Sequence, residues 1–104
     1  MSLRITYLEF ARRDLYDAWL WYEARERGLG DRFAMAVDAV LDQVATWPRS
    51  GSPAVEEAGE VVERRAGTAG FPYLVRYRII DDTILVTAVY HQRRHPDFGS
   101  ERSR

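Results

Sequence analysis

The side chains best suited to chemistry lie in the last third of the chain. His91 follows an apolar run and precedes a Gln-Arg-Arg sequence. A histidine there could act as a general base or acid in phosphodiester cleavage, with an arginine stabilising the charged transition state. The simpler alternative is a histidine at a strand end that hydrogen-bonds a carbonyl group. The other candidates are all arginines: Arg64, Arg65, Arg76, Arg78, Arg93 and Arg94.

These arginines belong to an uneven distribution of charge. Residues 1–63 carry seven Arg and twelve acidic residues, whereas residues 64–104 carry eight Arg and four acidic residues. All 15 basic residues are Arg, whose planar fork suits bidentate contact with phosphate or carboxylate groups. A sheet surface lined by guanidinium groups could therefore meet a nucleic-acid backbone. Ordinary solvated charges are the alternative explanation.

Other kinds of site find little support in the sequence. Because there is no Cys, a disulfide framework, a thiolate zinc site and a cysteine nucleophile are excluded. The two histidines have no carboxylate at metal-ligand spacing, and Gly67 and Gly70 match no phosphate-binding pattern. The acidic pairs at 56–57 and 81–82 fall in predicted loops or turns. We therefore expect neither a metal nor a cofactor.

Length and composition favour one small folded domain. The chain has 104 residues, of which 46% are hydrophobic and 12% aromatic, and a chain of this size forms one core rather than two. No apolar run approaches the roughly 20 residues of a membrane span. We expect a single domain over residues 1–104, located in the cytoplasm, with a polar tail from about residue 92.

Hydrophobic periodicity predicts two antiparallel helices in the first half of the chain. The first helix is expected to begin at a capping-box pattern formed by Thr6 and Glu9 and to run to about residue 27, before two glycines. The second is expected to run from Asp31 to Trp47, where the following proline ends it. Apolar residues recur at three- and four-residue spacing in both segments, which favours burial of one face of each helix.

Alternating patterns predict strands at both ends of the chain. A short strand is expected over residues 3–7, and longer stretches with a period of two cover residues 61–66, 71–80 and 83–91. Residues 48–60 are rich in Pro and Gly and are expected to form an exposed connection that could hold one short helical turn. The predicted fold is α+β: an N-terminal strand and an antiparallel helical hairpin packed on a small, mainly antiparallel sheet.

A two-residue turn at Asp81-Asp82 would set the register of the last two strands. Counting outward pairs Ile79 with Ile84, Tyr77 with Val86, Val75 with Ala88 and Tyr73 with Tyr90. This apolar face should lie against the helices. The opposite face then carries Arg78 beside Leu85, Arg76 beside Thr87 and Leu74 beside Val89, with His91 at the far end. We expect that mixed face to be exposed and to meet a partner.

The order of these elements, together with several short motifs, resembles the RelE/ParE superfamily of type II toxins. The resemblance extends from residue 3 to about residue 102. The motifs are A-x-x-D-L from Ala11, W-Y-E from Trp21, R-F at Arg32, W-P at Trp47, F-P-Y from Phe71, Y-R at Tyr77 and H-x-R-R-x-P from His91.

The resemblance implies a bacterial toxin that a cognate antitoxin holds inactive, with operator DNA bound only through the antitoxin. It also implies one of two activities. Relatives of the RelE kind cut mRNA in the ribosomal A site, whereas relatives of the ParE kind inhibit DNA gyrase. A module that has lost toxicity and only binds its antitoxin is a third interpretation.

The match to the RelE-like nucleases is incomplete. Leu74 stands where those nucleases carry a catalytic arginine, and Phe98, which cannot transfer a proton, stands near their C-terminal catalytic tyrosine. The long helical hairpin and the F-P-Y and H-x-R-R-x-P motifs are closer to the ParE side. We therefore favour gyrase inhibition, with ribosome-dependent mRNA cleavage as the alternative.

Each activity assigns different roles to the candidate residues. Under the nuclease interpretation, the resemblance implies that His91, Arg94 and Arg65 are catalytic. The residues expected to bind the target or RNA are Arg64, Arg76, Arg78 and Arg93. Under the ParE-like interpretation, the residues expected to contact the target are Arg76, Arg78, Arg93 and Arg94.

Overall fold

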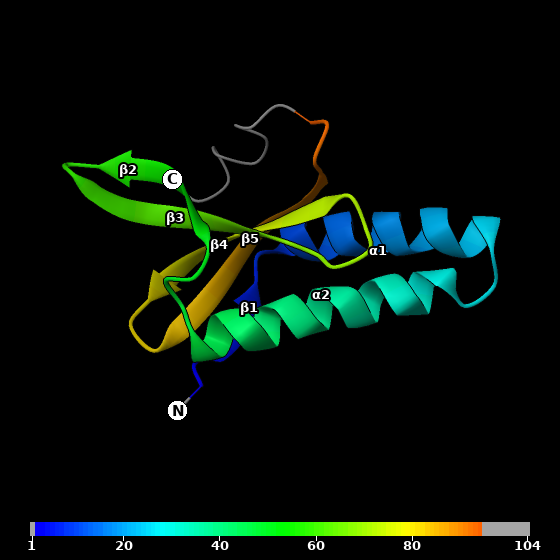
Figure 1. Ribbon diagram of the computed structural model, residues 1–104, viewed down its shortest axis with the longest axis horizontal. Helices are drawn as coiled ribbons and strands as arrows, with labels where there is room; N and C mark the ends of the chain where they lie inside the picture. Colours follow the sequence, from blue (N-terminus) through cyan, green and yellow to red (C-terminus); the bar gives the residue numbers. More distant parts are fainter. Residues whose placement is uncertain (1, 95–104) are drawn as a thin grey trace.

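The computed structural model describes residues 2–94 and contains two helices packed on a five-stranded sheet (Figure 1). The strands follow the order β1-β5-β4-β3-β2 across the sheet. β1 is parallel to β5, and the other neighbours are antiparallel. The predicted α+β fold is confirmed. In chain order the elements are β1 (Arg4–Tyr7), α1 (Glu9–Arg25), α2 (Leu29–Thr46), β2 (Ser52–Glu57), β3 (Glu60–Gly67), β4 (Tyr73–Ile80) and β5 (Thr83–His91).

Helix α1 begins without the predicted capping box. Thr6 is still part of β1, where it pairs with Leu85, so its side chain is not at the start of the helix. The N-cap is Leu8, and no side chain caps the helix there. The expected capping box is therefore wrong, because pairing with β5 keeps the chain extended up to Tyr7.

The turn between the helices depends on Gly28 and on a carboxylate from α1. Gly28 has a φ of 87°, in the left-handed region that glycine adopts without steric cost. The Glu23 carboxylate accepts hydrogen bonds from the backbone N–H groups of Gly28 and Gly30 at 3.0–3.1 Å. Gly30 lies inside α2 rather than in the turn, and a Cβ on it would stand 2.7 Å from the Trp19 carbonyl oxygen. The helices therefore approach each other closely at this point.

The main core lies between the helical hairpin and one face of the sheet. Tyr22 and Phe33 stack edge-on or tilted against each other and against Phe71 and Tyr73, with ring centroids 5.0–6.0 Å apart. Such aromatic pairs contribute beyond the area that they bury. The buried apolar residues of this cluster are Ala11, Ala18, Tyr22, Phe33, Val37, Leu41, Val75, Val86 and Val89.

The segment after α2 contains a strand that the sequence did not predict. The expected exposed connection over residues 48–60 is wrong for Ser52–Glu57, which forms β2 and pairs with β3. The hairpin turns at Ala58 and Gly59, both of which have positive φ. β2 is an edge strand, where a proline such as Pro53 is tolerated because one side of the strand has no pairing partner. The strand was not predicted because this segment is rich in Pro, Gly and acidic residues, which are uncommon in strands.

A β-bulge changes the predicted register of the last hairpin. The predicted pairs Ile79–Ile84 and Tyr77–Val86 are confirmed, but the ladder then shifts, so that Arg76 pairs with Ala88. Thr87 is the extra residue, and such a residue redirects every side chain beyond it. The expected pairs Val75–Ala88, Tyr73–Tyr90, Arg76–Thr87 and Leu74–Val89 are wrong. The observed pairs are Val75–Val89, Tyr73–His91 and Leu74–Tyr90.

None of the helices in the described part of the chain is long and apolar enough to span a membrane. The departure noted at Phe98 lies outside the described residues.

Candidate functional site

The bulge at Thr87 places the candidate residues of β5 on different faces of the sheet. Val89 joins the core beneath the helices, and His91 packs against Tyr73 on that same side, with ring centroids 5.4 Å apart. Tyr90 faces the other side, where burial raises the pKa of its phenol and the positive charges of Arg76 and Arg65 oppose that rise. The sequence-based register had placed Tyr90 against the helices and His91 on the opposite face. Both assignments are wrong, because each assumed an unbroken ladder.

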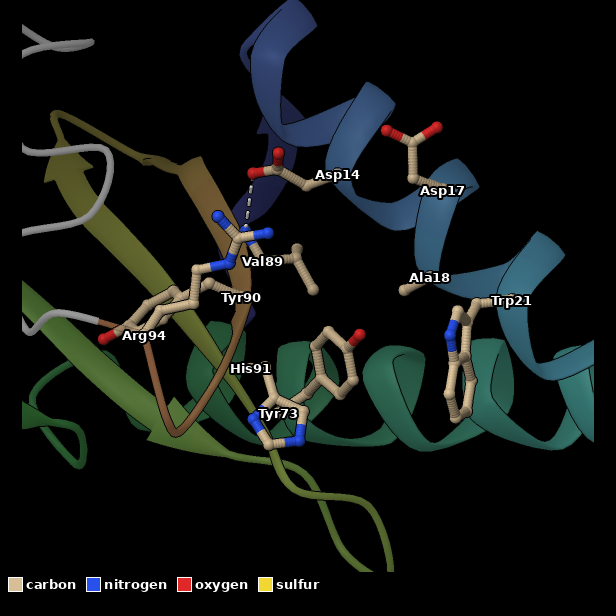
Figure 2. A pocket seen from close by; sticks show the side chains of 9 residues that line it. All are labelled: Asp14, Asp17, Ala18, Trp21, Tyr73, Val89, Tyr90, His91 and Arg94. Carbon is tan, nitrogen blue, oxygen red and sulfur yellow. Dashed lines mark hydrogen bonds between the residues drawn. The ribbon is translucent and has the colours of Figure 1, made fainter.

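His91 lies in a pocket between α1 and the end of β5, which we call the α1–β5 pocket (Figure 2). The pocket has a volume of about 230 Å³. Asp14 accepts a hydrogen bond from the backbone N–H of Val89 at 3.1 Å, which joins α1 to β5 at the rim of the pocket. The lining residues are Asp14, Asp17, Ala18, Trp21, Tyr73, Val89, Tyr90, His91 and Arg94.

The hydrogen bonding of His91 restricts what its imidazole can do. Its Nδ1 accepts a hydrogen bond from the backbone N–H of Arg93 at 3.1 Å. A neutral imidazole whose Nδ1 is an acceptor carries its proton on Nε2. His91 therefore presents an N–H donor at Nε2. The lone pair on its Nδ1 already accepts a hydrogen bond from the backbone of the same chain.

Tyr73 is also a donor rather than a base. Burial raises the pKa of its phenol above the usual value of 10.0, and the nearby positive charge of Arg94 opposes this only in part. Figure 2 shows the Arg94 side chain extending toward Asp14. At neutral pH the α1–β5 pocket thus combines donor groups with the carboxylates of Asp14 and Asp17, a composition suited to binding polar groups.

The face of the sheet opposite the helices buries a network of charges, which we call the Glu63 network. Glu63 is 0% exposed and Arg76 is 1% exposed. Glu63 Oε1 lies 3.5 Å from Arg76 Nε, and Glu63 Oε2 lies 3.6 Å from Arg78 Nη2. The Thr87 hydroxyl donates to the same carboxylate. The Glu63 carboxylate thus contacts two guanidinium groups and a hydroxyl group.

This burial corrects the expectation of an exposed mixed face. Arg76 and Thr87 are buried, and the side chain of Arg78 is only 18% exposed. Burial of charge is tolerated because opposite charges and hydrogen bonds offset the loss of hydration. Arg76 is therefore a support within the sheet rather than a surface contact.

Arg64 stabilises the loop that precedes β2. Its guanidinium donates to the carbonyl oxygens of Arg49 and Gly51 at 3.2 and 2.8 Å. In the same loop the Tyr77 hydroxyl donates to the Pro48 carbonyl at 2.7 Å and accepts from the Gly51 N–H at 3.0 Å. Arg64 therefore has a structural role in the described chain.

The sequence-predicted residues form two groups rather than one. His91 and Arg94 share the α1–β5 pocket. Arg65 pairs with Arg76 in the ladder and lies on the opposite face with Arg76 and Arg78. Arg93 is exposed, and its backbone N–H is bound by His91. The sheet thus separates His91 from Arg65.

Sequence reasoning missed several residues that shape these sites. Asp14 belongs to the A-x-x-D-L motif, but only the packing of α1 on β5 brings it to Val89. Glu63 had a usable signal, since a lone acid between valines and arginines in a strand suggests a buried ion pair. Within residues 2–94, no group of three or more His, Cys, Asp or Glu side chains gathers as a metal site would require.

Comparisons with known proteins place this geometry in context. A search of curated proteins finds no match. Among solved structures, the chain resembles that of the chromosomal ParDE toxin–antitoxin system from P. aeruginosa, with a TM-score of 0.59 and 15% identity over 86% of this chain and 96% of that one. It also resembles the structure of the RelBE2 toxin–antitoxin complex from Mycobacterium tuberculosis, with a TM-score of 0.60 and 23% identity over 88% of this chain and 99% of that one.

These structural similarities support the fold, and a match to a family model shows which protein family the chain belongs to. The model for the ParE toxin of the type II toxin–antitoxin system parDE matches residues 5–96. The match covers both helices and all five strands apart from Arg4, the first residue of β1. The chain therefore belongs to the ParE toxin family of type II toxin–antitoxin systems.

Proposed function

We propose that the protein arrests bacterial growth by binding and inhibiting DNA gyrase in the cytoplasm, and that a cognate antitoxin holds it inactive. Membership of the ParE toxin family supports the general role. The choice of gyrase over mRNA rests on the arrangement of the candidate residues around the sheet. The protein acts in this proposal as a binding inhibitor and not as a hydrolase.

The separation of the candidate nuclease residues is the observation that carries the choice. A general base must have an available lone pair within reach of the proton that it removes. The Nδ1 of His91 is occupied by the Arg93 N–H, and Arg65 lies on the far side of the sheet. Arg76 is buried against Glu63. These residues therefore do not converge on one scissile phosphate.

The arginines that retain access to solvent are suited to docking instead. Arg93 and Arg94 are exposed, and Arg78 is partly exposed. Arginine is enriched at protein interfaces because its planar fork forms several directed hydrogen bonds. In this proposal Arg78, Arg93 and Arg94 contact gyrase, while Arg76 holds Arg78 in place through their shared partner Glu63.

The surface beside the helical hairpin supports a protein partner. A hollow of about 310 Å³ lies at the junction of β1, α1 and α2 and is lined by Tyr7, Arg12, Leu15, Tyr16, Trp19 and Ala34. Tyr16 is 58% exposed. Exposed apolar surface of this kind favours a protein partner. We assign this hollow to the antitoxin, because its binding would bury apolar area between the helices and the first strand.

Ribosome-dependent mRNA cleavage is the second candidate function. It is favoured by the presence of His91, Arg94 and Tyr73 in one pocket. In that case the Arg93–His91 hydrogen bond would have to break before His91 could accept a proton. A protein that only binds antitoxin remains as the third interpretation.

The deciding experiment is controlled expression in bacteria, with plasmid supercoiling and mRNA primer extension measured in the same culture. We expect growth arrest with loss of supercoiling and intact mRNA. His91→Ala should change toxicity by less than about threefold, as should the exposed neighbour control Gln92→Ala, because no proton transfer is required. Codon-positioned mRNA cuts that His91→Ala abolishes would establish the nuclease function instead. Soluble expression without growth arrest would establish the non-toxic module.

The antitoxin proposal has a separate test by thermal unfolding of the free protein and of the complex with the antitoxin encoded beside it. A ligand at 100 times its Kd stabilises the folded state by about 2.7 kcal/mol. We expect a higher Tm for the complex, and we expect Tyr16→Asp to reduce that difference more than Arg13→Asp does. Equal melting temperatures for free and bound protein would contradict the proposal.

A further inference from the structure

Strands β3 and β4 are paired along only half of their length. Their ladder runs from Gly67–Leu74 to Arg64–Tyr77. Both strands continue, β3 back to Glu60 and β4 on to Ile80. Figure 1 shows the β2–β3 hairpin bending away from β4 and β5. No ladder pair joins residues 60–63 to residues 78–80, all of which lie within the described chain.

A cleft lies between the diverging strands, and we call it the β3–β4 cleft. It has a volume of about 320 Å³ and is lined by residues 60–64 of β3 and residues 77–80 of β4. The Glu63–Arg78 ion pair spans its inner end, directly beyond the last ladder pair. Because alternate residues of a strand direct their N–H and C=O groups toward each neighbour, both walls present backbone groups to the cleft.

The other ladders of these strands indicate why the hairpin bends. β3 remains paired with β2 up to Glu57–Glu60, with irregularities around Val55. Bulges bend a strand and increase its twist. β4 remains paired with β5 up to Ile80–Thr83. Each strand is therefore held firmly on its outer side, so that the gap between them is a stable feature and not a frayed end.

The chemistry of the walls indicates which kind of segment would fit. Ile79 and Ile80 are 38% and 48% exposed, and Ile79 also borders a hollow shared with Trp47, which is 68% exposed. The hairpin from residue 52 to residue 62 carries Glu56, Glu57 and Glu60 and no basic residue. Because an added strand directs alternate side chains to the two faces of the sheet, and Ile79 and Ile80 lie on opposite faces of β4, an occupant that carries both apolar and basic side chains would match both features.

We propose that the β3–β4 cleft receives an extended segment of a protein partner, carrying both apolar and basic side chains, as an added strand along β4. Strand addition obtains affinity from backbone hydrogen bonds and specificity from alternate side chains. An unpaired apolar strand edge favours such pairing. The proposal does not depend on whether gyrase or mRNA is the target, because it rests only on the geometry of β3 and β4.

The first test is amide hydrogen exchange of the full-length protein measured by NMR. In the free protein, the amides of residues 61–63 and 78–80 that face the cleft should exchange at least about tenfold faster than the paired amides of residues 64–67 and 74–77. Equal slow exchange in both stretches would mean that the strands close in solution, which would overturn the proposal.

The second test uses a defined probe, an end-blocked hexapeptide of alternating arginine and valine. We expect it to slow exchange at the cleft amides. The same peptide N-methylated at its valines keeps its charge and side chains but loses backbone donors, and it should give no protection. Equal protection by both peptides, or protection by neither, would overturn the proposal.

A pair of charge-reversal variants separates the cleft from general electrostatic attraction. Glu60→Arg should weaken binding of the unmethylated hexapeptide by roughly three- to tenfold, because the positive charge then faces the occupant. Asp42→Arg makes the same charge change at an exposed position on α2 and should leave the affinity within about twofold. Equal weakening by the two variants would overturn the assignment. Unchanged NMR spectra away from each substitution would show that both variants fold.

Discussion

Helices α1 and α2 cover one face of the sheet with apolar side chains, whereas the opposite face buries charge. On the helix side, Phe33, Val37 and Val86 are all 0% exposed, and their side chains belong to one hydrophobic cluster. On the other side, Glu63 is equally buried but contacts two guanidinium groups and a hydroxyl. Side chains of β4 and β5 contribute to both faces of the sheet. The bulge at Thr87 changes which side chains of β5 point to each face.

The two faces should differ in how well they tolerate amino-acid substitutions. Apolar packing is non-directional and can readjust after a conservative substitution. A buried ion network is directional, and the loss of one member leaves its partners desolvated. We therefore expect the Glu63 network to be the less tolerant face, although replacement of a whole network by apolar groups can be neutral in other proteins.

The largest expected effect comes from Glu63→Ala. The substitution removes the carboxylate that both Arg76 and Arg78 contact, and breaking a buried ion pair from one side typically costs about 3–5 kcal/mol. Chemical denaturation should reveal the loss. The matched control Glu60→Ala, at an exposed position of the same strand, should stay within about 0.5 kcal/mol of the parent. A similar small effect for both variants would remove the contrast between the faces.

A smaller loss is expected from Thr87→Val, which keeps the shape of the side chain but removes the donor to Glu63. Hydrogen bonds to charged groups contribute about 1.5–3 kcal/mol. The free energy of unfolding should fall by an amount in that range, without a change in the denaturant m-value. If the Thr87→Val and Glu63→Ala effects add independently in the double variant, the network does not act as a unit.

Tyr77 offers a comparison from the helix side of the sheet. Tyr77→Phe removes a buried hydroxyl that binds the Pro48 carbonyl and the Gly51 N–H, so we expect a loss of about 1–2 kcal/mol at neutral pH. Burial raises the pKa of Tyr77 above 10.0 in the folded protein. Its contribution is thus fully present below pH 10 and is lost as the pH rises through the folded pKa.

Denaturant titrations between pH 8 and 11 test this dependence on pH. The parent should lose stability above pH 10, and the loss should be shallower in Tyr77→Phe. Burial also raises the pKa of Tyr22, Tyr73 and Tyr90, so a residual slope is expected in the variant. Identical slopes in both proteins would refute the assigned role of Tyr77.

The smallest effect on stability is expected at a surface ion pair, which serves as a comparison for the buried ion pairs of Glu63. Arg4 Nη2 lies 3.7 Å from Asp82 Oδ1, and both side chains are more than 70% exposed. Hydration and salt screening reduce such pairs to less than about 1 kcal/mol. Arg4→Ala should therefore shift the unfolding midpoint only slightly, and less still at high salt. A loss as large as that of Glu63→Ala would show that burial is not the cause of the contrast.

Much of the fold could be predicted because its signals are local. The stripes of apolar residues marked both helices, Trp47-Pro48 marked the end of α2, and Asp81-Asp82 marked the last turn. Period-two alternation located β4 and β5 to within two residues. These features depend on periodicity and turn chemistry, which neighbouring residues determine by themselves.

The candidate site was less predictable, because it depends on contacts between distant segments. His91 and Arg94 were identified by residue type, and they do share a pocket. Which face His91 occupies depended on one extra residue at Thr87, and no local pattern marked that bulge. The burial of Arg76 depended on Glu63 from a neighbouring strand.

Local patterns in the amino-acid sequence were sufficient to identify the α+β class, the helical hairpin, the last turn and the concentration of arginine in the C-terminal part. Three features became apparent only in the folded chain: β2 pairs with β3, the bulge turns His91 toward α1, and Glu63 contacts both Arg76 and Arg78. The two sets of features differ in the range of the interactions that produce them. Periodicity and turns act over a few residues, whereas strand register and charge burial depend on segments far apart in the chain that meet only in the folded protein.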